Sequence, residues 1–496
     1  MKLLIFYLLI PLLAGCASTP KTRPLELGMD VPTQWQAAPA QDTVDSLWWI
    51  HLGDDQLPGL IKEALTHNHD LQAAAARLTA AQAQAKIAGA AQWPQVSADG
   101  NSQRNRRNFI GFPIPGQTGA VQSTTTSSFG VNFNINWEID LWGRLRAGQA
   151  AALADLQASS ADLGGVHLSL AAQTARAYFT AVEAHRQVEL AEATLENYTL
   201  STQRIQARYE RGLRPSLDLL LAHSNQATAE ANLHQRRRQL DGLKRQLELL
   251  LGRYPAAAIA LNSQLPRLEQ PVPAGLPAEL ISRRPDLIAA ERRLAASGAR
   301  VKEAKAALYP RISLTASGGR SSDQLSDLLD GDFSVWTLLG NITQPIFQGG
   351  RLKGAVKNAE AFEQQAVATY TQSVLRAFTE IESALAAEGH LALQEKALQT
   401  ASQQATAARL QAENRYAQGL TDLITMLTAQ RSAFDAESRL LSVQRQHLDN
   451  RIDLHLALGG GFTSNSDAAL TQDGRSDSAP ASAAFLTHQA QAKAEQ

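Results

Sequence analysis

The chain repeats itself, and this duplication limits its possible folds more than any other feature. The run Arg208-Tyr209-Glu210-Arg211-Gly212-Leu213 returns 207 positions later as Arg415-Tyr416-Ala417-Gln418-Gly419-Leu420. A second echo links Asp70-Leu71 to Asp286-Leu287 and Trp93-Pro94 to Tyr309-Pro310, with an offset of 216 positions. Because internal repetition sets the architecture of a chain, we expect one structural unit built twice, with a small length change inside it.

The first sixteen residues have the features of a secretory signal. Lys2 precedes an apolar run, Leu3 to Leu13, which is followed by Ala14-Gly15-Cys16. A run of about eleven residues is too short for a membrane helix, which needs roughly twenty, so we expect removal of residues 1–15 and a lipid on Cys16. Cys16 is the only cysteine, which excludes internal disulfides and zinc-thiolate sites. Ala17 behind it resembles the pattern that sorts bacterial lipoproteins to the outer membrane.

The amino-acid composition favours some fold classes and argues against some partners. Hydrophobic residues make up 44% of the chain but aromatic residues only 6%, which suits long, closely packed helices. The net charge of −1 argues against nucleic acid as a partner, because phosphate binding requires a basic surface. No apolar stretch after the signal reaches the length of a membrane helix, so any spanning part is predicted to consist of strands.

One segment alternates as a transmembrane strand does. From Val131 to Asp140 every odd residue is apolar and every even residue is polar. We expect the apolar face to meet lipid, the polar face (Asn132, Asn134, Asn136, Glu138, Asp140) to line water, and Trp137 and Trp142 to lie near a membrane interface. A half-buried strand of a soluble sheet is the alternative. This alternating strand is predicted over about 129–140, and further strands at 95–104, 311–320 and 334–344. The polar loops at about 105–125 and 321–332 are expected to be extracellular tips.

The remaining sequence predicts helical hairpins. Two proline-free helices are expected over 144–211 and 351–418, each roughly 100 Å long at 1.5 Å per residue. Val374, Phe378, Ile381 and Leu385 have the spacing of a seam against a partner helix. Gly212 and Gly419 are expected to end the long helices, and shorter helices are expected over 216–251 and 422–458, with Ser216 and Thr421-Asp422 as candidate N-caps.

The number of predicted strands restricts how many copies of the chain can form a closed barrel. Four strands in one chain do not close a barrel, and lipid tolerates no open sheet edge. Two copies would give eight strands with a filled interior, whereas three would give twelve strands and room for a lumen. The sequence therefore predicts a homotrimer.

Several motifs resemble one known family. They are Trp48-Trp49 with Gly53-Asp54 and Leu57, Arg283-Arg284-Pro285-Asp286-Leu287 through Ala290-Glu291-Arg292-Arg293-Leu294, Leu308-Tyr309-Pro310, and Pro345-Ile346-Phe347-Gln348-Gly349-Gly350-Arg351-Leu352. Together and in this order they resemble the TolC-like outer-membrane factors, and within them the lipoprotein branch resembling OprM and NodT efflux channels. The resemblance covers nearly the whole mature chain, up to about Gly459.

The resemblance implies a fold and a role. The fold class is mainly α with transmembrane β, in which a trimer forms a 12-stranded β-barrel continuous with a 12-helix periplasmic tube. The role is a passive exit duct for small toxic compounds, in the outer membrane of a Gram-negative bacterium. The implied partners are outer-membrane lipid, a periplasmic adaptor (membrane fusion protein) and an inner-membrane pump that is proton-driven. A type I protein-secretion duct and a non-conducting structural periplasmic lipoprotein stay open as alternatives, and an adaptor protein is a further rival class.

By the same resemblance, the hairpin ends form a periplasmic tip that opens like an iris. Tyr416 and Ile424 are expected to help close it, and the turns at Gly212 and Gly419 to contact the adaptor. Where family members often carry an aspartate in a Leu-Asp-Ala segment, this chain has Leu427-Thr428-Ala429, and Thr425 stands one turn earlier. Asp218 and Asp422 could still make an acidic entrance, or could serve only as charges at helix starts.

The expected organisation is a signal peptide (1–15), a lipid-anchored arm (16–55), repeat one (56–270), repeat two (271–459) and a disordered tail (460–496). His67 and His69 are two positions apart without further ligands nearby, which is a weak basis for a metal site. No phosphate-binding loop and no hydrolase motif is present, so we expect no catalysis, no cofactor and no metal.

Overall fold

The computed structural model describes residue 35 and residues 47–109, 121–268 and 283–460. These residues all fall within one compact unit, Met1–Phe462. The expected signal peptide, the lipid site Cys16, most of the expected arm and nearly all of the expected tail lie outside the described residues.

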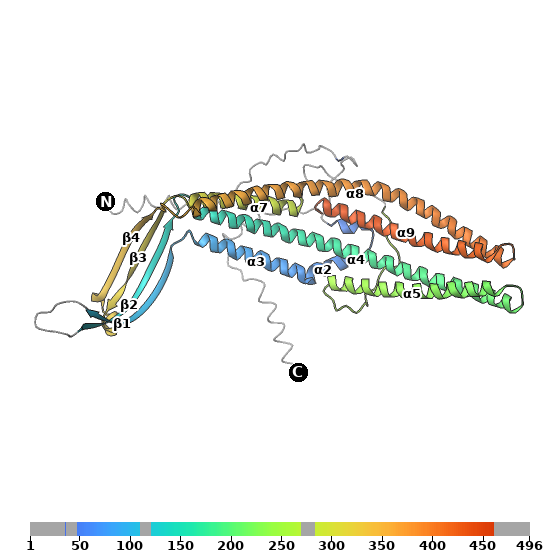
Figure 1. The fold of residues 1–496 in the computed structure, drawn as a ribbon, viewed down its shortest axis with the longest axis horizontal. Helices are drawn as coiled ribbons and strands as arrows, with labels where there is room; N and C mark the ends of the chain where they lie inside the picture. Colours follow the sequence, from blue (N-terminus) through green and yellow to red (C-terminus); the bar gives the residue numbers. More distant parts are fainter. Residues whose placement is uncertain (1–34, 36–46, 110–120, 269–282, 461–496) are drawn as a thin grey trace, which may run out of the picture. The chain divides into compact units, whose positions relative to one another are not determined.

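Two long helical hairpins dominate the fold (Figure 1). The first consists of α4 (Arg144–Glu210) and α5 (Ser216–Leu250), and the second of α8 (Arg351–Ala417) and α9 (Leu423–Ala457). Both long helices have 67 residues and both return helices have 35, so the duplication extends to element lengths. The shorter helices are α2 (Leu57–His67), α3 (His69–Ala90) and α7 (Pro285–Ala306). Helix α4 packs against α3, α5, α7 and α9, and α8 packs against α7 and α9.

The strands form one antiparallel sheet of order β1-β2-β3-β4. Their bounds are β1 (Gln95–Phe109), β2 (Gln122–Ile139), β3 (Arg311–Ser322) and β4 (Ser334–Thr343). The polar loop expected at 105–125 is strand at both of its ends: Asn105 pairs with Thr126 and Phe109 with Gln122, while residues 110–120 lie outside the described residues. Threonine suits extended backbone, and the cross-strand partner supplies the hydrogen bonds that the polar sequence pattern did not reveal.

The second β-connection also differs from a plain loop. Strand β3 continues to Ser322, and two short 3-10 turns follow, η4 (Leu325–Leu329) and η5 (Gly331–Phe333). The Asp330 side chain accepts a hydrogen bond from the Asp332 amide, 3.1 Å away, which stabilises the second turn.

The two faces of the sheet differ in polarity as the alternation in β2 predicts. Ala98 pairs with Phe133, and Phe133 with Gly318, so apolar positions share one face, while Asp99 and Asn132 share the other. Asp140 lies just past β2, however, and accepts hydrogen bonds from the Leu145 and Arg146 amides at the start of α4. It stabilises a helix start, which corrects its expected place in the polar row of the strand.

The largest core lies where α2, α4, α5 and α9 meet. Trp48, Leu57, Ile61, Tyr178 and Phe179 are among its fully buried side chains. The Trp48–Leu52 segment, at the end of the expected arm, is a 3-10 helix (η2) that packs in this core.

One carboxylate explains the Gly53-Asp54 motif. Asp54 is buried; one of its oxygens accepts from the Gln56 and Leu57 amides, and the other from the Tyr178 hydroxyl and the Asn262 amide group. It thereby joins the start of α2 to α4 and to the segment after α5.

The predicted seam of α8 is confirmed. Val374, Ile381 and Leu385 are buried, and Phe378 packs against the same cluster. Trp35 lies there too, with its ring centroid 6.1 Å from that of Phe378. Trp35, which precedes η2 in the chain, therefore contacts α8.

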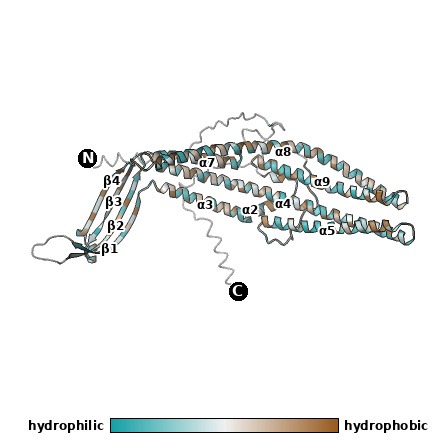
Figure 2. Ribbon diagram, viewed as in Figure 1, coloured by the Kyte–Doolittle hydropathy of each residue, from teal (hydrophilic) through white to brown (hydrophobic). Residues whose placement is uncertain are grey.

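Apolar and polar residues are interspersed along every long helix (Figure 2). Among the described residues, no helix combines the length and the hydropathy that a membrane span requires. Within the same ranges, no group of three or more His, Cys, Asp or Glu side chains is arranged to hold a metal ion. His67 ends α2 and His69 begins α3, and their rings contact the Glu63 carbonyl and the Gln72 side chain.

Candidate functional site

The candidate site lies at the ends of the two helical hairpins, where both turns have the same geometry. Gly212 and Gly419 have φ angles of +73° and +79°. The Leu213 amide donates to the Arg208 carbonyl and the Gly212 amide to the Tyr209 carbonyl, and the Leu420 and Gly419 amides bond the Arg415 and Tyr416 carbonyls in the same way. This pair of bonds is a Schellman motif, which a left-handed glycine closes. Nothing lies within 4 Å of a Cβ built at either glycine, so backbone conformation alone requires glycine there.

The return helices begin differently. Asp422 is the N-cap of α9: its carboxylate accepts from the Thr425 amide at 2.7 Å and from the Thr425 hydroxyl at 3.0 Å. These hydrogen bonds lower the pKa of Asp422. Ser216 is not an N-cap, because it is already the first helical residue and Pro215 occupies the cap position without a side-chain bond.

Tyr416 lies between the two hairpins. Its side chain is 4% exposed and packs in one cluster with Ile205 and Ala222 of the first hairpin and with Leu423 and Met426 of the second. Burial raises the pKa of the Tyr416 phenol. Its hydroxyl oxygen is buried and has no hydrogen-bond partner within the described ranges.

Two arginines of the first hairpin hold the end of α8. Arg208 donates to the carbonyl oxygens of Tyr416 at 3.1 Å and of Ala417 at 2.6 Å, in the last turn of α8. Carbonyls of the last turn lack an amide partner four residues on within the helix, and the Tyr416 carbonyl also accepts from the Gly419 amide. The guanidinium carbons of Arg208 and Arg214 lie 5.5 and 4.8 Å from the centroid of the Tyr416 ring. Arg214 also faces Asp218, with 3.9 Å between guanidinium and carboxylate. The sequence marked Tyr416 and Asp218 but gave no sign that these arginines join the hairpins.

The other predicted aperture residues lie elsewhere. Ile424, Thr425 and Thr428 are exposed on α9, and Ile424 keeps 59% of its surface. The structure thus separates a buried contact at Tyr416 from an exposed surface at Ile424, Thr425 and Thr428. Their role as an aperture stays a prediction.

A polar layer follows the Tyr416 cluster. Gln430 is fully buried and donates to the Ser201 hydroxyl of α4 and to the Glu413 carboxylate of α8. Asn197 of α4 donates to the same Glu413 oxygen at 3.0 Å. Gln430 interrupts the buried series Leu423, Met426 and Ala433, and a lone glutamine at a seam position is the signal that could have marked it.

A charged cluster joins α8 to α9 further along. The two ring nitrogens of His447 lie 2.9 Å from Glu395 and 3.2 Å from Glu388. Arg451 and Asn450 also donate to Glu388. Burial alone would raise the pKa of Glu388, but the bonds from His447 and the charge of Arg451 outweigh it and lower that pKa to about 2. Bonding to Glu388, helped by Glu395, raises the pKa of His447 against the effect of burial.

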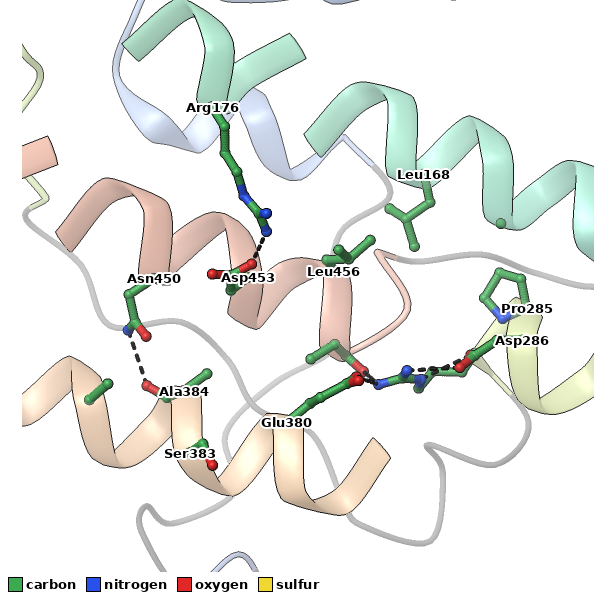
Figure 3. Close-up of a pocket in the computed structure, with 14 residues that line it drawn as sticks. Leu168, Arg176, Pro285, Asp286, Glu380, Ser383, Ala384, Asn450, Asp453 and Leu456 are labelled. Atoms are coloured by element: carbon green, nitrogen blue, oxygen red, sulfur yellow. Dashed lines mark hydrogen bonds and ion pairs between the residues drawn. The ribbon is translucent and has the colours of Figure 1, made fainter. Parts of the chain in front are cut away.

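A pocket of about 660 Å³ lies among α4, α7, α8 and α9 (Figure 3). Arg284 on its wall donates to Asp286, to Glu380 at 2.7 Å and to the Ala457 carbonyl at 3.1 Å. Arg176 forms an ion pair with Asp453 across it. The Arg284-Pro285-Asp286 motif therefore joins the start of α7 to α8 and to the end of α9, and every charge named here is already paired.

Two helical hairpins of equal length contact each other near their turns, and the same chain carries a four-stranded antiparallel sheet. This combination of long helical hairpins with strands defines the class of protein. The family model described as outer membrane efflux protein matches residues 60–253 and 276–460. The pyoverdine export outer membrane protein OpmQ of Pseudomonas putida is 34% identical over 466 residues, covering 92% of this chain and 97% of its own. The toluene efflux pump outer membrane protein TtgI of Pseudomonas putida is 35% identical, with 83% of this chain and 86% of its own covered.

The fold agrees with solved structures. The open state of the MtrE outer membrane channel of Neisseria gonorrhoeae has a TM-score of 0.77 and 28% identity, covering 90% of this chain and 99% of that one. The chain belongs to the outer membrane efflux protein family. It is an outer-membrane component of an efflux system of a Gram-negative bacterium, as the motif resemblance predicts.

Proposed function

We propose that three copies of this chain form a passive exit duct, in which twelve strands close a β-barrel in the outer membrane and twelve helices continue it as a periplasmic tube. The observation that carries the proposal is the sheet, whose β1 and β4 each have one open edge among the described residues. Open edges are not tolerated in lipid, and four strands are too few to close. The duct itself carries out no reaction and takes its energy from its partners.

The cargo we propose is small toxic compounds. The names of two relatives specify export of pyoverdine and of toluene, which are small molecules rather than proteins. An inner-membrane pump, proton-driven by the resemblance to the lipoprotein branch, hands the cargo over through a periplasmic adaptor. The turns at Gly212 and Gly419, being the exposed ends of the hairpins, are the surface we assign to adaptor contact.

The closed tip is held by the contact between Tyr416 and the two arginines. Opening has to separate the hairpins, and the bonds from Arg208 to the Tyr416 and Ala417 carbonyls are those that would break. Ile424, Thr425 and Thr428, with Asp422 and Asp218, supply the surface of the entrance. Asp422 is the N-cap of α9 and Asp218 faces Arg214. We therefore assign these carboxylates mainly to stabilising the hairpin turns, and only in addition to an acidic entrance.

The test is a growth-inhibition panel of dyes, detergents, antibiotics and aromatic acids on a deletion strain. Complementation with the wild-type gene should restore resistance to small compounds, and the purified protein should give step conductance in planar bilayers. Unchanged growth together with altered proteins in the medium would favour the type I secretion duct. A protein that forms neither detergent-resistant trimers nor conducting channels would favour the structural lipoprotein and refute the proposal.

A further inference from the structure

The inference concerns the two open edges of the sheet. In the part of the chain that the structure describes, β1 pairs only with β2, and β4 only with β3. Strand β4 exposes Trp336, Leu338 and Ile342, with 81%, 72% and 69% of their surfaces accessible. An unpaired edge with large apolar side chains is a template for another strand.

The duplication is visible in the strand register. Gln95 pairs with Asn136, and Arg311 pairs with Thr343. Arg311 lies 216 positions after Gln95, and Thr343 lies 207 positions after Asn136, which are the two offsets of the sequence repeat. The two β-hairpins therefore correspond residue by residue: β1 matches β3 with the first offset, and β2 matches β4 with the second.

We infer that β4 of one copy pairs with β1 of the next copy in the register that β2 and β3 already show, which places Trp336 directly opposite Arg106. The inference rests on the proposed trimeric duct. Phe129 of β2 pairs with Ser322 of β3. Moving Phe129 forward by 207 positions gives Trp336, and moving Ser322 back by 216 gives Arg106. Likewise, Val131 pairs with Arg320, and the same two shifts place Leu338 opposite Arg104.

The register accommodates the whole of β4. Its ten residues, Ser334–Thr343, would pair with Asn108 down to Asp99, all of which lie within β1. The first four residues of β1 and Phe109 are left over. No residue of β4 would keep an open edge, as a strand in lipid requires.

The faces of the sheet provide an independent check. Ala98 pairs with Phe133, Phe133 with Gly318 and Gly318 with Trp336, so these four positions share the apolar face. Arg106 is an even-numbered residue of β1, like Ala98, and so lies on that same face. A slip of one residue would place the apolar residues of β4 beside the polar face of β1, and the inferred register avoids this.

The side chains that meet at the inferred edge are complementary. Arg106 donates to the Ser123 hydroxyl and has no carboxylate partner among the described residues, and Trp336 exposes most of its ring. A guanidinium opposite an indole on one face makes a cation-π pair.

Disulfide cross-linking tests the register, because Cys16 is the only native cysteine. The variant N105C/T337C places cysteines opposite each other on the polar face, and R104C/L338C does so on the apolar face. Directly opposite residues have Cα atoms about 4.5 to 5.5 Å apart, within the span of a disulfide, whereas diagonal neighbours at roughly 7 to 8 Å lie outside it. Mild oxidation of the intact outer-membrane protein should therefore yield a covalent trimer from both variants.

The matched controls move one cysteine by two residues along the same face, as N105C/V335C and N105C/L339C. We expect the initial rate of cross-linking to be at least about tenfold lower in the controls, given the disulfide span. Faster linking in a control would show a slipped register and overturn the inference. Intact trimers with no link in any variant would overturn it too, whereas the loss of both trimers and conductance in the unmodified protein would refute the proposed duct instead.

Discussion

Tyr416 is a residue at which the two hairpins meet. Its ring fills a cluster drawn from both hairpins, while its hydroxyl oxygen is buried without a partner in the described residues. Packing, rather than a hydrogen bond of the phenol, therefore holds it within one copy. A buried polar atom without a partner costs about 1 to 3 kcal/mol, so this hydroxyl destabilises the isolated contact.

The first prediction separates the ring from the hydroxyl. Tyr416→Ala should destabilise the tip by roughly 3 kcal/mol, because a large buried ring is lost, and should raise channel conductance and vancomycin sensitivity. Tyr416→Phe, the matched control, keeps the ring and removes the unpartnered hydroxyl, so both should stay at or below their wild-type values. Single-channel recordings and growth assays measure the two effects. An open phenotype for the phenylalanine variant would show that another copy bonds the hydroxyl.

Ile424→Ala should also loosen the tip if this exposed residue faces the entrance. If neither alanine variant changes conductance or sensitivity, the placement of the aperture is refuted.

His447 leads to a prediction about pH. Both of its ring nitrogens face carboxylates, and both carry protons only in the imidazolium form. The pKa of His447 is raised in the folded state, so its stabilising effect is complete below about pH 6.5 and is lost as pH rises through the raised value. We expect roughly 2 kcal/mol between the extremes.

The measurement is the thermal unfolding of the purified protein between about pH 5.5 and about pH 9, a range that brackets the ordinary pKa of histidine. The wild type should lose stability with rising pH relative to His447→Gln, which keeps one hydrogen bond but does not titrate. Parallel curves for the two proteins would mean that the charged cluster of His447 with Glu388, Glu395 and Arg451 does not control the pairing of α8 with α9.

At the scale of single residues, the sequence identified what recurs and missed what occurs once. Tyr416, Gly212 and Gly419 belong to the repeated run and could be named in advance. Gln430 and His447 have no counterpart that drew attention, and their partners lie on other helices, as Ser201 and Glu388 do. Which polar side chains meet across long helices depends on the helix packing, which no local pattern specifies.

At the scale of elements, local rules predicted the helices well and the strands less well. Gly212 and Gly419 mark where α4 and α8 end, and no proline interrupts either helix. The strands extend past their apolar stretch because Arg104 to Phe109 find cross-strand partners in Ser127 to Gln122. Alternation of apolar and polar residues ends where a strand leaves an apolar environment, although its backbone pairing continues.

The third prediction concerns the hairpin turns. Gly419→Ala should destabilise the second hairpin by about 1 to 2 kcal/mol, because alanine is strained at a φ of +79°. Gly389→Ala is the control: this glycine lies inside α8 with nothing within 4 Å of the position that a Cβ would take, and alanine there should stabilise by about 1 kcal/mol. Hydrogen exchange of the amides around residue 419 checks both variants, and equal exchange in the two would contradict the role of glycine in the turn.

At the scale of the whole molecule, the duplication makes one chain nearly two equivalent units. The strand register, the helix lengths and the turn geometry all repeat with the same two offsets. A ring of three such chains would present six similar hairpins at its tip. The sequence could predict this architecture because repetition is visible along the chain, but it could not predict that Arg208 joins two different hairpins, since that contact spans 208 positions.

The last prediction concerns how the whole molecule is held in the membrane. Cys16→Ser removes the thiol that the expected lipid requires, but a sheet of many strands embedded in the bilayer does not depend on that lipid to stay there. We therefore expect detergent-resistant trimers to persist and resistance to fall by only a few-fold. Ala17→Asp is the matched control, since it keeps the lipid and changes the sorting signal, and it should lower the amount of protein in the outer membrane. Mass spectrometry of the amino terminus and quantitative fractionation check both variants. If Cys16→Ser abolished trimers although the variant is synthesised in the same amount as the wild type, the lipid anchor would be required for assembly. The open edges of the sheet would then pair only between chains already held at the membrane.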